Sequence, residues 1–334
     1  MNDLSSAPVP SPLARISGIA GFLERMTGRS TDRPARPLAD RVTLDLLGLG
    51  IEQAYAHLLD RRPDLDAFSD WVMATAGPPD PVRVARFNAW MDGGPVPEAA
   101  DGRLRAIDAM DAVLDADDLA HWDRNGYVVL RGAVTREEAA AAEALLWRLV
   151  GGDAADPATW YGPRVAGFMV GHYQDPALEA ARRSPRIHKA FAQLRGTADL
   201  WCSTDKMSFN PPETAALPFQ GTPLHWDMSL AQPMPLMTGG ILYLTDTAAD
   251  GGALRVVPGF HRRIAGWLTE IGDADPRGID LTAEAVPVPA GAGDLVIWRH
   301  ELPHGASPNR AGRPRLAQYV NYYDADAVPH ETWL

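Results

Sequence analysis

The chain has 334 residues, of which 46% are hydrophobic and 22% charged, a globular balance that excludes wholesale disorder. Its 31 basic and 43 acidic residues give a formal net charge of −12, so binding to nucleic acid or anionic lipid is not expected. The single cysteine, Cys202, excludes an internal disulfide and a multi-cysteine zinc site. No apolar stretch reaches the roughly 18 residues of a membrane span and no signal-peptide pattern opens the chain, which favours a cytoplasmic protein outside the membrane.

Residues 1–105 predict a helical N-terminal extension, because apolar residues recur at helical spacing between proline clusters. The expected helices cover 13–26, 42–59, 66–75 and 82–91, and a linker follows at 93–97. No combination of residues in this part indicates catalysis. Its apolar stripes are typical of a helical core, and they also offer a surface for a homodimer or a cap over a neighbouring site.

Residues 106–334 predict a second domain that is richer in strands. A helix over 115–125, a strand over 127–130 and a helix from Thr135 to about 150 come first, and Thr135 with Glu138 matches a capping box. Short strand patterns follow at 200–209, 240–246, 253–257, 284–288, 294–299 and 315–323. This order favours an α+β protein with a mainly β core, an antiparallel barrel or sandwich with helices packed outside.

The tripeptide His-Trp-Asp occurs twice, at 121–123 and 225–227. Two histidines and one carboxylate on one face of a metal leave three open positions, as in non-haem Fe(II) oxygenases. On a strand, residues i and i+2 point to the same side, whereas on a helix they lie about 200° apart. The first copy lies in a predicted helix and the second follows a proline-rich extended segment. His225 and Asp227 are therefore the candidate ligands, and the alternative is an ordinary His–Asp hydrogen bond on a loop.

A third ligand must come from elsewhere, and His300 and His304 compete for this place. His304 follows a proline and precedes a glycine, so it can begin a new strand with its ring turned inward. Arg315 lies on a predicted strand and shares one face with Ala317 and Tyr319. An inward guanidinium requires an anion, because burying an unpaired charge is costly. The anion would be either a bound carboxylate in a bidentate clasp or one of the chain's own acids.

Five sequence blocks in order, spanning about 120–325, resemble the phytanoyl-CoA dioxygenase family of Fe(II)- and 2-oxoglutarate-dependent oxygenases. The blocks are GYVVLRG at 126–132, HWD at 225–227, GGALRVVPGFHR at 251–262, GDLVIW at 293–298, and HGASPN at 304–309 followed by Pro314 and Arg315. The resemblance implies a double-stranded β-helix, a cupin-like jelly-roll barrel with flanking helices. It implies that the iron ligands are His225, Asp227 and His304, that Arg315 binds the distal carboxylate of 2-oxoglutarate, and that Met207 and Tyr243 line the cosubstrate pocket.

The same resemblance implies that Fe(II), 2-oxoglutarate and O2 oxidise a C–H bond, with succinate and CO2 as coproducts. Related halogenases lack the carboxylate ligand, so the presence of Asp227 favours hydroxylation or another oxidation over halogenation. The alternatives are a metal-dependent enzyme of another class on the same barrel, or a non-catalytic binding protein.

Apolar side chains in the segments expected to form the pocket walls favour a small, rather hydrophobic metabolite as substrate. These segments are 160–174, 209–222, 228–238 and 322–334, and their apolar residues include Trp160, Tyr161, Phe168, Met169, Met228, Met234 and Met237.

Overall fold

A computed structural model describes residues 11–162, 168–218, 222–330 and 332–334. The chain divides into two compact units, with the boundary between Arg103 and Leu104. This boundary lies inside helix α6 (Glu98–Asp108), which the sequence pattern did not predict. In the described part of the chain, no helix is both long and apolar enough to cross a membrane.

The first unit consists of helices α1 (Ile19–Met26), α2 (Ala39–Leu46), α3 (Ile51–Arg61), α4 (Leu65–Thr75), α5 (Pro81–Asp92) and the beginning of α6. The prediction of a single helix over 42–59 was wrong, since α2 ends at Leu46 and α3 begins at Ile51. Gly48, at φ 67°, adopts a left-handed backbone that interrupts the helix. The first predicted helix is shorter than expected, because the chain before Ile19 forms turns.

A six-stranded antiparallel sheet forms the centre of the second unit, in the order β1-β8-β5-β10-β4-β2. Its strands are β1 (Tyr127–Leu130), β2 (Met169–Val170), β4 (Met207–Asn210), β5 (Thr238–Tyr243), β8 (Leu295–Arg299) and β10 (Arg315–Tyr319). Side chains alternate between its faces: in β8, Leu295 and Ile297 join one core cluster, and Val296 and Trp298 join another.

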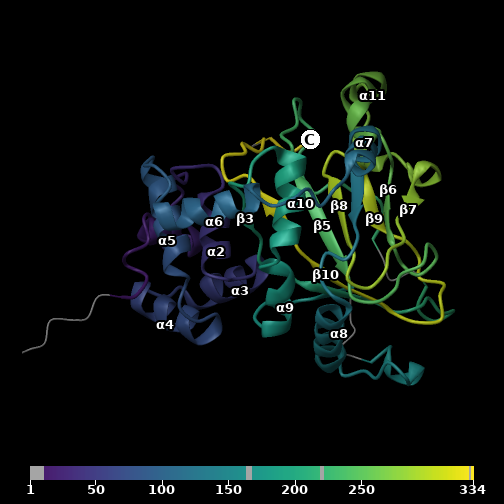
Figure 1. The fold of residues 1–334 in the computed structure, drawn as a ribbon, viewed down its shortest axis with the longest axis horizontal. Helices are drawn as coiled ribbons and strands as arrows, with labels where there is room; N and C mark the ends of the chain where they lie inside the picture. Colours follow the sequence, from purple (N-terminus) through teal and green to yellow (C-terminus); the bar gives the residue numbers. More distant parts are fainter. Residues whose placement is uncertain (1–10, 163–167, 219–221, 331) are drawn as a thin grey trace, which may run out of the picture. The chain divides into compact units, whose positions relative to one another are not determined.

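Each face of this sheet packs on a different layer. One face is covered by helices α7 (Ala116–Asn125), α8 (Arg136–Val150), α9 (Pro176–Arg182) and α10 (Pro185–Arg195) (Figure 1). The other face packs on a short sheet of β7 (Val286–Pro287), β6 (Leu254–Val256) and β9 (His304–Ala306), and on helix α11 (Ile264–Ile271). The mixed architecture with a large antiparallel sheet confirms the predicted fold class at this coarser level.

Several predicted boundaries differ from the structure. The expected strand at 200–209 is two strands, β3 (Trp201–Cys202) and β4, and the expected strand at 315–323 is β10 and β11 (Tyr322–Tyr323). β3 and β11 pair with each other in a separate two-stranded sheet. Helices α9, α10 and α11 were not predicted.

Candidate metal and cosubstrate site

His225, Asp227 and His304 converge in the second unit. One ligand atom from each side chain lies within 4.8 Å of the other two. A β-bridge joins the two histidines: the His225 amide donates to the His304 carbonyl at 2.9 Å, and the His304 amide donates to the His225 carbonyl at 3.1 Å. Because residues i and i+2 of an extended segment share one side, Asp227 faces the same space as His225. The other His-Trp-Asp copy lies on α7, as predicted.

Backbone carbonyls fix the orientation of both imidazoles. The Nδ1 of His225 lies 2.8 Å from the Pro223 carbonyl, and the Nδ1 of His304 lies 3.1 Å from the Leu302 carbonyl. A carbonyl only accepts, so each Nδ1 carries the proton and each neutral ring keeps a lone pair on Nε2. These Nε2 atoms lie 3.4 and 3.1 Å from the carboxylate oxygens of Asp227. Lone pairs on all three groups therefore meet at one point, which calls for a proton or a cation between them, and this donor set suits a divalent transition metal.

Arg315 is buried at the start of β10 and faces the core between the two sheets. Its Nη1 donates to the Ser208 hydroxyl at 2.6 Å and its Nε donates to the Gly252 carbonyl at 3.1 Å. Its guanidinium carbon lies 4.5 Å from the ring centroid of Phe168. Among the described residues, no carboxylate lies within ion-pair distance of Arg315. The structure thus offers no internal salt bridge there, and a bound anion would remove the cost of the unpaired charge.

Asn210 provides a second unpaired polar group beside Arg315. It is the cross-strand partner of Arg315 and is 1% exposed. Neither its Nδ2 nor its Oδ1 has a hydrogen-bond partner among the described residues. A Cβ atom on Gly252 would lie only 2.4 Å from this Nδ2, so the amide and the guanidinium both pack against Gly252. A buried amide without a partner is uncommon, and here it leaves a donor next to a buried cation.

The sequence profile of the phytanoyl-CoA dioxygenase (PhyH) family matches residues 122–317. The chain belongs to this family. The predicted family, enzyme class and cofactors are confirmed: the protein is a dioxygenase that uses Fe(II) and 2-oxoglutarate.

Individual relatives of this PhyH protein are distant. An ectoine dioxygenase of Bordetella parapertussis is 26% identical over 243 residues, covering 63% of this chain and 75% of the relative. A putative phytanoyl-CoA dioxygenase of Dictyostelium discoideum is 20% identical over 263 residues, covering 62% of this chain and 75% of the relative. The crystal structure of GlcNAc Inducible Gene 2 from Candida albicans aligns with a TM-score of 0.50 at 14% identity over 64% of each chain, which is a similarity of fold.

The two other predicted cosubstrate residues of this PhyH protein lie on different faces of the large sheet. Met207 packs into the helix-covered core, so the structure does not bring it to Arg315. Tyr243 faces the core between the sheets, where its hydroxyl donates to the Val288 carbonyl at 3.1 Å and accepts from the Leu254 amide at 2.8 Å. Burial raises the pKa of Tyr243 to about 12, and the positive charge of Arg315 opposes this shift. Cosubstrate binding by either residue remains a prediction.

Trp298 and His300 lie next to the metal candidate His304. The Trp298 ring centroid is 5.1 Å from that of His304, and its buried Nε1 has no partner among the described residues. The indole lies across Gly239, where a Cβ atom would come within 2.3 Å of it. His300, the competing third ligand, stacks on His304 at 6.2 Å, and burial lowers its pKa to about 4. The cluster of ligand atoms includes His304 and not His300.

Asp227 and His225 change each other's pKa when no metal is bound. Burial opposes ionisation of Asp227, but hydrogen bonds with His225 and His304 outweigh it and hold the pKa of the carboxyl far below its usual range. The hydrogen bond to Asp227 raises the pKa of His225, with burial opposing the shift. A metal ion must displace the His225 proton, because only the neutral imidazole is a ligand.

Metal binding should therefore weaken as the pH falls through the raised pKa of His225. Below that pKa each metal ion releases one proton, so affinity should fall by up to about tenfold per pH unit; above it, affinity should level off. Co(II) titrations followed by visible absorption over about pH 5.5 to 8 would measure this, with proton release recorded in weak buffer. A constant affinity across the range would show that His225 is not a ligand.

Arg277 holds the backbone on both sides of Asp227. Its guanidinium donates to the carbonyls of Trp226 at 3.0 Å and Met228 at 2.7 Å. The same group donates to the carbonyl of Leu334 at 2.9 Å and lies 4.7 Å over the ring of Trp333. The Asp227 side chain is 46% exposed, against 5% for His304, so packing alone does little to fix its direction. The Arg277 clamp supplies this constraint through the backbone.

Arg277→Ala should weaken Co(II) binding by about 10- to 100-fold, the usual cost of losing a group that orients a metal ligand. Arg277→Lys should recover part of the loss, because one ammonium cannot copy the fork that reaches both carbonyls. Arg262→Ala, an exposed arginine of the same unit, is the control. Wild-type Co(II) affinity in Arg277→Ala would contradict this role.

Proposed function

We propose that His225, Asp227 and His304 bind Fe(II) and that Arg315 binds the distal carboxylate of 2-oxoglutarate. The oxygenase then oxidises a C–H bond of a small, rather hydrophobic metabolite, with succinate and CO2 as coproducts. The convergence of three lone-pair donors on one point carries this proposal. The buried Arg315, which has no acid partner in the described chain, supports the cosubstrate assignment.

We propose a double-stranded β-helix as the scaffold. Two antiparallel sheets face each other across one apolar core, and Tyr243, Val256, Val296 and Ala317 contribute to it from both sheets. Arg315 enters this core from the large sheet, and His304 lies on β9 of the short sheet. Residues from both walls would thus approach a keto acid held between them.

Bound Fe(II) would supply the activation of O2 coupled to decarboxylation of the keto acid. The chain's own groups have separate tasks. The carbonyls of Pro223 and Leu302 hold the proton of each neutral ring on Nδ1, which leaves both Nε2 atoms aimed inward. Arg315, with Ser208 and Asn210 beside it, holds the distal carboxylate by charge-assisted hydrogen bonds. Trp298 provides an indole N–H and an apolar wall that limits water near the reacting atoms.

The hydrophobic substrate is supported by some predicted wall residues and not by others. Met234 packs against the core between the sheets, and Met228 is buried next to Asp227. Trp160 instead packs in the helix-covered core, where its Nε1 donates to the Asp153 carbonyl at 2.8 Å. The wall residues 163–167, 219–221 and 331 lie outside the described residues.

Succinate release is the direct test. Purified protein loaded with Fe(II) under anaerobic conditions, then given 2-oxoglutarate and air, should release succinate slowly, and faster when an apolar substrate is added. A panel graded from charged to apolar compounds would test the substrate class. If the loaded protein binds 2-oxoglutarate without releasing succinate under any condition, the proposed reaction is wrong. If it binds metal but no keto acid, another enzyme class on the same barrel is favoured.

A further inference from the structure

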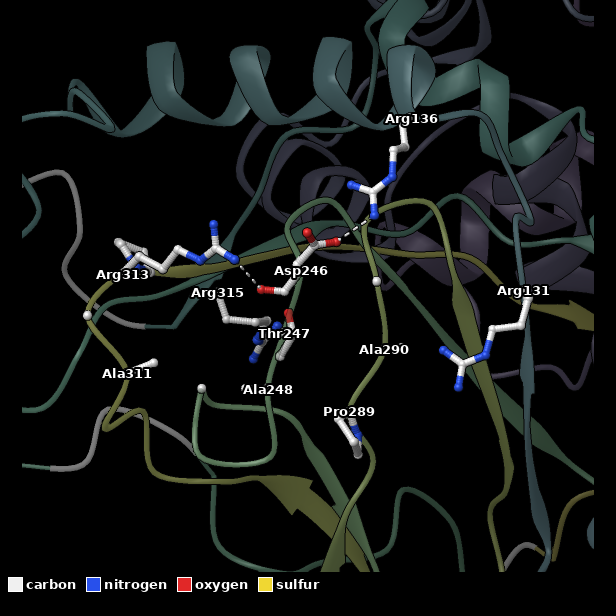
Figure 2. Close-up of a pocket in the computed structure, with 14 residues that line it drawn as sticks. Arg131, Arg136, Asp246, Thr247, Ala248, Pro289, Ala290, Ala311, Arg313 and Arg315 are labelled. Atoms are coloured by element: carbon white, nitrogen blue, oxygen red, sulfur yellow. Dashed lines mark hydrogen bonds and ion pairs between the residues drawn. The ribbon is translucent and has the colours of Figure 1, made fainter.

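A cleft of about 920 Å³ lies in the second unit, and Figure 2 shows the side chains that line it. Its lining comes from the turn after β1, the first residue of α8, and the segments that follow β5, precede β8 and precede β10. The described residues around it do not include His225, Asp227 or His304. The oxygenase reaction proposed above does not use the exposed side chains of this cleft.

Positive charge dominates the lining, although the chain as a whole carries a net charge of −12. The charged lining residues in the described part of the chain are four arginines and one acid: Arg131, Arg136, Arg313, Arg315 and Asp246. One further acid, Asp294, pairs with Arg131 at 2.7 Å. Arg315 is assigned above to the cosubstrate, so among the described residues the other three guanidinium groups face two carboxylates, which leaves an excess of one positive charge. The side chains of Arg131 and Arg136 are 65% and 68% exposed, so solvent and solutes reach them.

Asp246 organises two of these arginines. Its Oδ1 accepts from the Arg136 Nη2 at 3.1 Å and from the Ala292 amide at 2.8 Å, and its backbone carbonyl accepts from the Arg313 Nη2 at 3.2 Å. The hydrogen bond from the Ala292 amide, followed by that from Arg136, lowers the pKa of Asp246, which stays ionised. In Figure 2 the two guanidinium groups approach Asp246 from different sides. Asp246 thus holds both cations in place before any ligand arrives.

Most guanidinium donors remain available. A guanidinium has five N–H groups. Among the described residues, the guanidinium groups of Arg131, Arg136 and Arg313 each donate one hydrogen bond to a protein oxygen. The neighbouring positions carry small side chains or none: Ala248, Gly251, Ala290, Gly291, Ala311 and Gly312. This leaves room for a ligand close to the arginines. None of the described residues that line the cleft is aromatic, so these residues offer no surface on which a nucleobase could stack.

We propose that this cleft binds the phosphate or diphosphate group of a small-molecule ligand, separately from the iron site. A carboxylate has two oxygens in one plane and is satisfied by one arginine fork. A phosphate group presents oxygens in several directions and can accept from several guanidinium groups at once. The excess of positive charge and the arginines from three separate segments fit the second geometry.

Calorimetric titration of the full-length, metal-free protein with sodium diphosphate at low ionic strength tests this proposal. We expect saturable binding at one site. Arg136→Gln and Arg313→Gln should each weaken it by about tenfold, since each removes a charged hydrogen-bond donor. Arg148→Gln, an exposed arginine at the far end of α8 and outside the lining, should bind diphosphate like the wild type.

Three results would overturn the proposal. One is the absence of saturable binding at millimolar diphosphate. Another is binding that the Arg136 and Arg313 substitutions leave unchanged. The third is displacement of diphosphate by 2-oxoglutarate, which would make the cleft an extension of the cosubstrate pocket around Arg315. Because the first titrations contain neither iron nor keto acid, their failure would leave the proposed oxygenase function standing.

Discussion

Asp227→Ala should reduce succinate release to the level of protein-free controls. Asp227 supplies the anionic ligand of the proposed iron site, and both imidazole Nε2 atoms face it. Groups that merely orient a metal ligand contribute about 10- to 100-fold in affinity, so loss of a ligand itself should weaken Fe(II) or Co(II) binding by more than about 100-fold. Metal titration and succinate release should therefore fail together.

The chain contains a matched control for this substitution. Asp123 ends the other His-Trp-Asp tripeptide, but it lies on α7, where a helix separates the two side chains. Asp123→Ala should bind metal and release succinate like the wild type. In the metal-free protein, Asp227→Ala should also return the pKa of His225 toward its ordinary value, because the hydrogen bond that raises it is gone. Succinate release at the wild-type rate by Asp227→Ala would refute the ligand assignment.

The comparison of these two tripeptides explains why the triad could be predicted. The i, i+2 rule distinguishes a strand from a helix without knowledge of the tertiary fold, and it selected His225 and Asp227. Alternation along the strand likewise turned Arg315 inward, where the structure places it. Local backbone geometry alone determines which side of a strand or helix each of these side chains faces. Tertiary pairing then brings His304 to the pair through the bridge to His225.

Other features depend on information that the sequence pattern did not reveal. The prediction of one strand over 200–209 missed the point at which β4 begins. Alternation along β4 directs Ser208 and Asn210 toward Arg315, and it directs Met207 to the other face of the sheet. Helices α9 and α10 each begin with a proline that follows a capping residue, Asp175 or Ser184. Proline is typical of loops, but it is also favourable at the first position of a helix, so the sequence pattern alone did not predict these helices. Arg277 acts across a sequence separation of about fifty residues, which no local pattern reports.

Arg315→Leu should raise the concentration of 2-oxoglutarate needed for half-maximal succinate release by about 30-fold or more. Removing one partner of a buried, hydrogen-bonded charge pair costs about 2–5 kcal/mol, and 1.4 kcal/mol corresponds to a factor of ten. For Arg315→Lys, this concentration of 2-oxoglutarate should lie between those of Arg315→Leu and the wild type. A single ammonium keeps the positive charge but loses the two-pronged hydrogen-bonding geometry of the guanidinium. Arg310→Gln, whose exposed guanidinium pairs with Glu213, is the control.

Thermal unfolding separates this binding role from a purely structural one. Without keto acid, Arg315 is a buried cation with no acid beside it in the described chain, so its replacement by the apolar, shorter leucine should cost little stability. With saturating 2-oxoglutarate and a non-reactive metal such as Mn(II), the wild type should gain stability, since the ligand binds only the folded state. Arg315→Leu should lose most of that gain while keeping the stabilisation by metal alone. A variant that unfolds early without ligand, yet gains as much as the wild type from 2-oxoglutarate, would show that Arg315 supports the fold and that the cosubstrate carboxylate binds elsewhere.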